Sequence, residues 1–117
     1  MKDDNLYFIH IMERLERIES FIQGGREEFL RSRLVQDAVI RNFEVIGEAA
    51  KRVSKRSRDK YKTVPWKRIA GFRDILIHQY EGVELEKIWN IIALELPKVK
   101  QEIGAILIAA GVDWHQP

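Results

Sequence analysis

Long stretches of helix-favouring residues, rarely interrupted by glycine or proline, most strongly limit what this chain can fold into. Only three prolines and seven glycines occur among 117 residues, and these residue types are the usual interruptions of a helix. Between them, apolar residues recur every three or four positions, which is the period of one helix face. The sequence therefore predicts an all-α fold. A length near that of one ordinary domain further predicts a single domain over residues 1–117.

Glycines, prolines and apolar spacing also predict where the helices begin and end. The first helix is expected to end at Gly24 and Gly25, and the second to run from about Glu27 to Val53. The third is expected to run from Val64 or Pro65 to about His78. The fourth is expected to begin near Glu84 and to be kinked or divided by Pro97, before a closing segment from Ile103 to Ala110. Asp3, Asp4 or Asn5 is expected to cap the start of the first helix. Gly47 lies inside the second helix at a cost of about 1 kcal/mol in helix propensity. We therefore expect another backbone to pack closely against it.

Composition excludes several classes of protein. Hydrophobic residues make up 45% and charged residues 32% of the chain, which argues against disorder and against residence in a membrane. The longest apolar run, 103–112, is shorter than the roughly 20 residues that span a bilayer, and the first nineteen residues are too charged for a signal peptide. We expect a cytoplasmic protein without a membrane partner. The absence of cysteine and the scattered histidines predict neither a metal site nor a cofactor.

Positive charge is concentrated in one window of the chain. From Lys51 to Arg73 there are ten lysines and arginines against a single acid, Asp59, so this window carries +9 and the rest of the chain −7. Such a concentration indicates an anionic partner, with nucleic acid as the first candidate. Charged clusters between helices are as often solvated loops, so charge alone leaves both interpretations open.

The segment that follows, "GFRDILIHQYEGV", places Arg73, Asp74, His78 and Tyr80 in apolar surroundings. Asp74 and His78 are four residues apart and share a helix face, so the carboxylate can orient the imidazole and raise its pKa. Arg73 and His78 lie about 140° apart around the helix. They can cooperate only if the helix unwinds near His78 or if they come from different subunits. From spacing alone, an ordinary ion-pair network at a helix surface is the simpler interpretation.

The motif within this segment resembles that of a known family. "RDILIHQY" is similar to the pattern of HEPN ribonucleases, in which an arginine, a polar residue and three further residues precede a histidine. A tyrosine two residues after the histidine narrows the resemblance to the HepT toxin family. Three blocks resemble that family in the same order: "AVIRNFEVIGEAAKRVS" (38–54), "VPWKRIAGFRDILIHQY" (64–80) and "IWNIIALELPKVKQEI" (88–103).

The resemblance implies a HEPN-type antiparallel bundle of four to five helices that forms a homodimer and cleaves RNA without a metal. His78 would act as base or acid, Arg73 would stabilise charge on the phosphate, and Asp74 would orient His78. A dimer would supply a second histidine and so both a base and an acid. The basic residues expected to hold the RNA backbone across the dimer cleft are Lys51, Arg52, Lys55, Arg56, Lys67 and Arg68.

The resemblance also implies a biological setting. The chain would be the toxin of a type VII-like toxin–antitoxin pair, whose antitoxin is the small nucleotidyltransferase MntA. Tyr80 matches the tyrosine on which that enzyme places AMP, and the added phosphate and bulk would silence the toxin.

A second class of function uses the same surface without catalysis. In this alternative, the chain is a helical module that binds a nucleotide or docks a nucleotidyltransferase as its regulatory subunit. The presence of Arg73, Asp74, His78 and Tyr80 together favours the enzyme. His10 and His115 match no motif. Trp66 and Trp89 are expected in the core, and the place of Trp114 is left open.

Overall fold

The computed structural model describes residues 2–78 and 84–115, with the backbone alone for residues 2–3 and 75–78. Within these ranges the chain is helical and has no strand: α1 is Lys2–Phe21, α2 Gly25–Arg31, α3 Arg33–Arg52, α4 Lys55–Lys60, α5 Trp66–His78, α6 Leu85–Leu94 and α7 Leu96–Ala109. The predicted all-α fold is confirmed. In the described part of the chain there are seven helices rather than the expected four to five, because two expected helices are divided and α4 is an additional short one.

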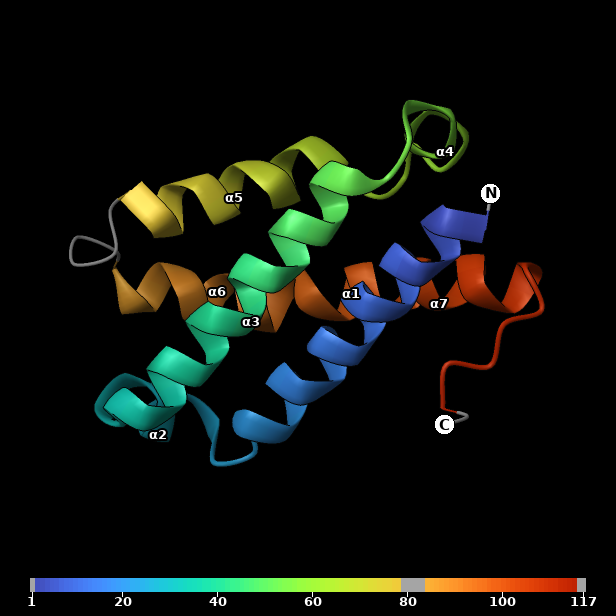
Figure 1. Ribbon diagram of the computed structural model, residues 1–117. Coiled ribbons are helices and arrows are strands. Elements are labelled where there is room, and N and C mark those ends of the chain that lie inside the picture. The colour runs from blue at the N-terminus through green and yellow to red at the C-terminus, as the bar shows by residue number, and fades with distance from the viewer. Residues whose placement is uncertain (1, 79–83, 116–117) are drawn as a thin grey trace.

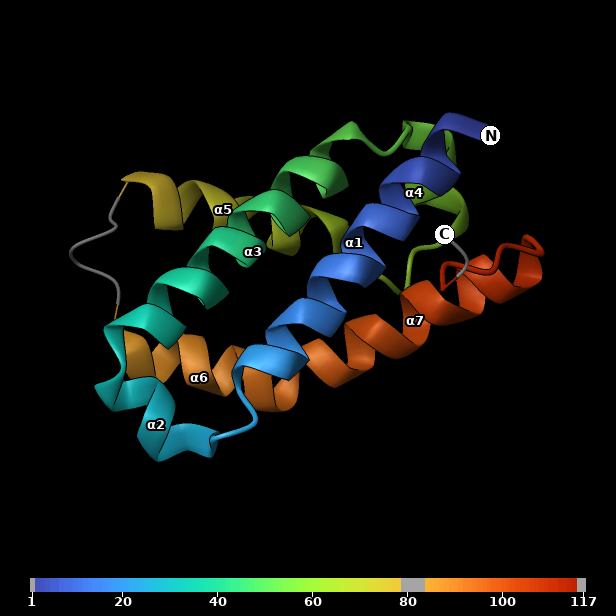
Figure 2. The same cartoon turned by 60° about the horizontal axis from the view of Figure 1, so that its bottom comes forward.

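The arrangement is centred on α3. This helix packs against α1 on one flank and against α5 on the other, and both views show the three helices in that order (Figures 1 and 2). α7 packs against α1, while α6 contacts both α7 and α2. α4 and α2 lie at opposite ends of the molecule (Figure 1). No helix in the described ranges combines the length and the apolar character that crossing a bilayer requires.

On α1, the apolar residues that recur every three or four positions lie in the core, as that period predicts. Phe8, Ile11, Leu15 and Ile18 are each at most 2% exposed, and they belong to one cluster with buried residues of the other helices. Trp66 is also buried, and Trp89 packs against the same cluster. Both tryptophans therefore belong to the core, as predicted.

The second expected helix is interrupted at Ser32, so the prediction of one continuous helix from 27 to 53 is wrong. Ser32 has an extended backbone (φ −95°, ψ 109°), and its Oγ accepts a hydrogen bond from the Val35 amide at 3.2 Å. This is an N-cap, which satisfies a donor that the start of a helix otherwise leaves without a partner. Ser32 thereby ends α2 and begins α3.

The other predicted boundaries agree closely with the structure. α1 ends before Gly24, and Gly25 has a φ of 83°, which glycine adopts readily. α5 begins at Trp66, directly after Pro65. Pro97 lies in the first turn of α7, and a break at Glu95 separates α7 from α6, so the predicted division is confirmed.

Asp4 has a different role from the predicted one. α1 already begins at Lys2, so the prediction that Asp3, Asp4 or Asn5 caps this helix is wrong. The Asp4 carboxylate is 3% exposed and accepts hydrogen bonds from Ser54 N (3.0 Å), Ser54 Oγ (2.6 Å) and Ser57 Oγ (2.6 Å). Burial raises the pKa of Asp4, but the hydrogen bonds from Ser54 and Ser57 together outweigh burial and lower the pKa below its ordinary value. Asp4 thus fastens the start of α4 to α1.

Candidate active site and basic surface

Gly47 brings α3 and α5 together at the position of Arg73. A Cβ atom at residue 47 would overlap the Cβ of Arg73 and lie 3.3 Å from the Ile69 carbonyl oxygen. Only a residue without a side chain allows the two helices to approach this closely. The prediction of a closely packed backbone at Gly47 is therefore confirmed, and its neighbour is the helix that carries the motif.

Arg73 is held by two carboxylates. Its Nη1 lies 3.1 Å from Asp74 Oδ1 on the same helix, and its Nη2 lies 3.1 Å from Glu48 Oε2 on α3. The side chain of Arg73 is 26% exposed, so the guanidinium is partly sheltered from water. A guanidinium has five N–H donors, so two such contacts fix its orientation while engaging only part of its donor capacity.

The two ion pairs belong to a longer chain of alternating charges. Lys51 Nζ lies 2.9 Å from Asp74 Oδ1, and Arg52 Nη2 lies 3.5 Å from Glu48 Oε1. The order is Lys51, Asp74, Arg73, Glu48, Arg52, with three cations and two anions. This network has a surplus of one positive charge beside Arg73, which favours an anionic ligand.

Asp74 is kept ionised by its neighbours. The hydrogen bond from Lys51, followed by that from Arg73, lowers the pKa of Asp74 below its ordinary value. In the described residues its Oδ1 therefore accepts from two cations. His78 is the last residue of α5, but its side chain lies outside the described residues, as does Tyr80. The orientation of His78 by Asp74 stays a prediction.

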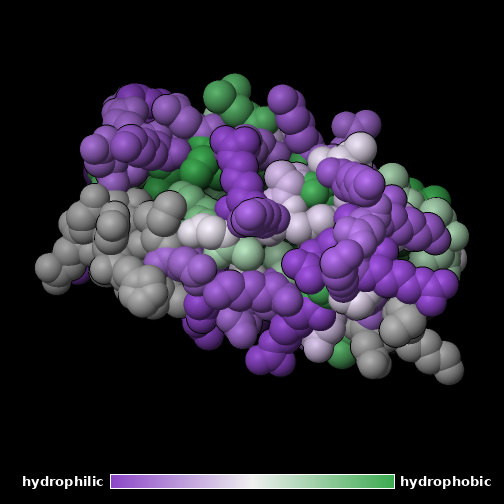
Figure 3. Space-filling model, turned by 90° about the horizontal axis from the view of Figure 1, so that it is seen from above, coloured by the Kyte–Doolittle hydropathy of each residue, from purple (hydrophilic) through white to green (hydrophobic). Residues whose placement is uncertain are grey.

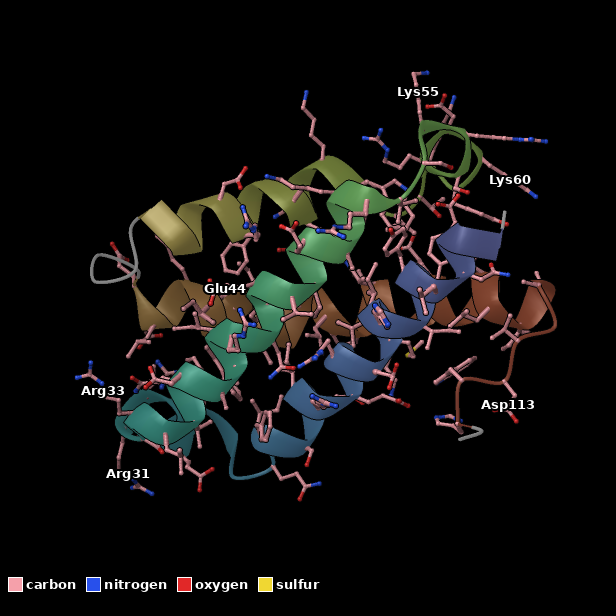
Figure 4. All side chains as sticks on the ribbon, viewed as in Figure 1. Arg31, Arg33, Glu44, Lys55, Lys60 and Asp113 are labelled. Atoms are coloured by element: carbon pink, nitrogen blue, oxygen red, sulfur yellow. The ribbon has the colours of Figure 1, made fainter. Side chains whose placement is uncertain are left out.

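A groove on the α1–α3 face passes beside Arg73. It has a volume of about 460 Å³, and we call it the Arg73 groove. It is lined by Leu6, Tyr7, His10, Arg41, Glu44, Val45, Glu48, Ala49, Arg52 and Arg73. Figure 4 shows Glu44 on α3 in this region.

Sequence reasoning missed two residues of the Arg73 groove. Glu48 contacts Arg73 directly, and it follows Gly47, whose predicted close packing already marked this turn as a contact with another helix. His10 lines the same groove from α1. No motif surrounds His10, so only the packing of α1 on α3 places this histidine in the groove.

The six predicted RNA-binding residues are distributed over more than one surface. Lys51, Lys67 and Arg68 line a second groove of about 730 Å³, where α3, α4 and α5 meet; we call it the basic groove. Arg52 lines the Arg73 groove instead. On α4, Lys55 pairs with Asp59 at 2.8 Å, and Arg56 lines a separate hollow with Phe8 and Tyr61. Figure 4 shows Lys55 directed away from the bundle.

Comparison with known proteins identifies the family. Residues 11–106 match the family described as "Ribonuclease HepT-like". The chain belongs to the HepT-like ribonuclease family. Among solved structures, none matches it.

Curated relatives of this HepT-like chain carry ribonuclease names. A protein of Caldanaerobacter subterraneus named "Putative RNase" is 39% identical over 92% of this chain and 96% of its own length. "Probable ribonuclease HepT" of Thermococcus cleftensis is 37% identical over 80% of this chain and 86% of its own length. A Methanocaldococcus jannaschii protein named "Gamma-glutamylcyclotransferase and putative RNase" is 44% identical over 91% of this chain. The HepT-like chain spans only about half (48%) of that relative.

Proposed function

We propose that this HepT-like protein is an endoribonuclease that cleaves RNA without a metal ion, using Arg73 and His78. The observation that carries the proposal is the fixed guanidinium of Arg73, held by Glu48 and Asp74 on the helix that ends at His78. A guanidinium fixed before the substrate arrives stabilises developing negative charge without having to reorganise during the reaction. The ribonuclease names of the relatives give the same class of reaction.

The proposed chemistry is an internal transfer at phosphorus. A base removes the proton from the ribose 2′-hydroxyl, and the 2′-oxygen attacks the adjacent phosphorus. The P–O5′ bond breaks as an acid donates a proton to the leaving 5′-oxygen, so that the products are a 2′,3′-cyclic phosphate and a 5′-hydroxyl. Arg73 would bind the phosphate oxygens that gain charge, and His78 has a pKa in the range required of a base or an acid at neutral pH.

We further propose that the active site is completed by a second copy of the chain. The reaction needs a base and an acid, while the motif contains one histidine. A homodimer in which the two motif helices face one cleft would supply both. It would also let Arg73 act with the His78 of the partner subunit, which removes the difficulty of their 140° separation on one helix.

The proposed biological role is that of a toxin in a HepT/MntA toxin–antitoxin system. In this role, a nucleotidyltransferase of the MntA type transfers AMP to the hydroxyl of Tyr80. An added phosphodiester carries negative charge and bulk two residues from His78. It would compete with RNA for the positive field around Arg73.

The decisive experiment is incubation of the purified protein with total RNA in the presence of EDTA. We expect cleavage by the wild type with cyclic phosphate ends, and none by His78→Ala or Arg73→Ala, because each variant lacks a group that acts in the transition state. Circular dichroism and gel filtration should show the same helix content and the same dimer for all three proteins. Cleavage that requires added metal, or equal cleavage by wild type and both variants, would contradict the proposed mechanism.

A further inference from the structure

The basic groove combines several cations with an apolar floor. Of its ten lining residues, five are lysine or arginine and none is aspartate or glutamate. The cations are Lys51, Arg58, Lys62, Lys67 and Arg68, and the others are Ala50, Val64, Pro65, Trp66 and Ala70. They come from the end of α3, from α4, from the α4–α5 connection and from the first turns of α5. Figure 3 shows the molecule from above, from the side of α5 and α4, with hydrophilic side chains spread over much of this face.

Three of these cations form no close ion pair with the described residues, although Arg58 and Lys62 act on Asp59 at longer range and help to lower its pKa. Lys51 pairs with Asp74 at 2.9 Å and Arg68 with Glu95 at 2.6 Å, whereas Arg58, Lys62 and Lys67 form no ion pair with any residue that the structure describes. Asp59, the acid of this window, is hydrogen-bonded by Lys55 on α4. Five cations without an acid in the lining of one groove repel one another in the free protein, and an anionic ligand relieves that repulsion.

One cation of the groove is linked to Arg73 through a shared carboxylate. Lys51 lines the groove and binds Asp74, and the same carboxylate oxygen binds Arg73. A ligand that contacts Lys51 therefore lies one shared carboxylate away from Arg73. A volume of about 730 Å³ lies in the range of about 300–1,000 Å³ that is usual for ligand pockets. A groove of this size is better suited to a segment of a polymer than to a single small ion.

We infer that the basic groove binds the phosphodiester backbone of the RNA substrate through Arg58, Lys62 and Lys67 and directs it toward Arg73. The inference rests on the proposed ribonuclease function and adds Arg58 and Lys62, which belong to the basic window, to the six residues predicted to bind RNA. The link from Lys51 through Asp74 to Arg73 is the reason to choose RNA over an acidic protein surface. A protein docked in the groove would have no need of a path to the motif helix.

The test compares two pairs of charge deletions. The groove pair is Arg58→Gln with Lys62→Gln, and the control pair is Arg31→Gln with Arg33→Gln. Both pairs remove two exposed arginine or lysine charges, but the control residues lie at the end of the molecule opposite α4 (Figure 4). All proteins carry His78→Ala so that bound RNA stays intact. The affinity for a fluorescently labelled single-stranded RNA oligonucleotide is measured by fluorescence anisotropy at salt concentrations from roughly 50 to 300 mM.

The expected loss follows from counterion release. Each phosphate contact contributes a slope of about −0.7 to the logarithm of affinity against the logarithm of salt for single strands. Loss of two contacts should therefore weaken binding about 25-fold near 0.1 M salt and reduce the slope by about 1.4. The control pair should lose no more than about 3-fold, because charges beyond a Debye length are largely screened. Lys67→Gln alone should weaken binding about 5-fold.

Two results would overturn the inference. One is equal loss of RNA affinity in the groove pair and the control pair, with circular dichroism showing both proteins folded. The other is unchanged RNA binding by the groove pair together with loss of binding to a co-expressed nucleotidyltransferase, which would make the groove a protein-docking surface. Failure of the proposed function would look different. In that case the groove pair would still bind RNA less tightly, but wild-type protein would not cleave it.

Discussion

Replacement of Gly47 by alanine tests how closely α3 and α5 must approach each other. The new methyl group would overlap the Cβ of Arg73, and it would also lie 3.3 Å from the Ile69 carbonyl oxygen. Both atoms are fixed to the backbone of α5, so a change of rotamer cannot relieve the contact. The two helices must separate, and Arg73 must move away from Glu48.

The magnitude follows from two opposing effects. Overpacking of a close contact costs typically about 1–3 kcal/mol, and a contact with backbone-fixed atoms belongs at the upper end. Alanine regains about 1 kcal/mol of helix propensity over glycine. We therefore expect Gly47→Ala to lower the free energy of unfolding by about 2 kcal/mol. For a domain of this size that corresponds to a decrease in Tm of about 10 °C.

Gly71→Ala is the matched control on α5 itself. A Cβ at residue 71 would meet no atom within 4 Å, so only the propensity gain of about 1 kcal/mol applies. Thermal unfolding followed by circular dichroism should show a lower Tm for Gly47→Ala and a higher Tm for Gly71→Ala. If both variants are stabilised alike, the close approach at Gly47 does not limit the fold, and the explanation of this glycine is wrong.

Three further predictions concern single residues. Asp4→Asn should destabilise the protein at pH 7 by about 1–3 kcal/mol, the cost of weakening buried hydrogen bonds to a charged group. Because the folded pKa of Asp4 is lowered, its stabilising effect is present above the unfolded pKa of about 3.9 and is lost as pH falls through the folded pKa, so the difference in urea unfolding between wild type and variant should shrink steadily as pH is lowered below about 3.9. Glu48→Gln should lower kcat for RNA cleavage about ten-fold or more, because Arg73 loses a contact that orients it, while RNA affinity and Tm stay unchanged. A loss of RNA affinity as large as the loss of kcat would contradict a positioning role for Glu48. Tyr80→Phe should cleave RNA normally but gain no AMP mass when co-expressed with the nucleotidyltransferase, as measured by mass spectrometry, and an AMP adduct elsewhere on the chain would exclude Tyr80 as the acceptor.

Much of the fold could be predicted because its helices end at residues with strong local effects. Gly25, Pro65 and Pro97 act on the backbone within one or two residues of themselves, so their positions in the sequence are close to the observed boundaries. The break at Ser32 was missed because the apolar period continues across it. A serine hydroxyl can bind a nearby amide in a cap or remain in solvent within a helix, and sequence alone does not distinguish these outcomes.

The site was less predictable because it depends on contacts between distant residues. Arg73 and Asp74 belong to one short motif, but Glu48 and Lys51 reach them from α3. The basic window is continuous in sequence, yet the turns around α4 direct its side chains toward different grooves. The concentration of positive charge in the sequence therefore predicts an anionic ligand, whereas the division of the cations among surfaces depends on the packing of α3, α4 and α5.

The contacts that hold α4 in place and the charges that would bind a ligand in the basic groove should respond differently to salt. The Asp4 carboxylate is buried, and its hydrogen bonds from Ser57 and Ser54 are buried and partly buried respectively, so mobile ions screen them little. The exposed cations of the groove lie within reach of those ions, whose screening length shortens to about 3 Å at 1 M salt. Concentrated salt should therefore release a bound polyanion while α4 keeps its place. A column loaded with the protein could be stripped of nucleic acid and reused, since the surface that binds it is built on contacts that salt does not disturb.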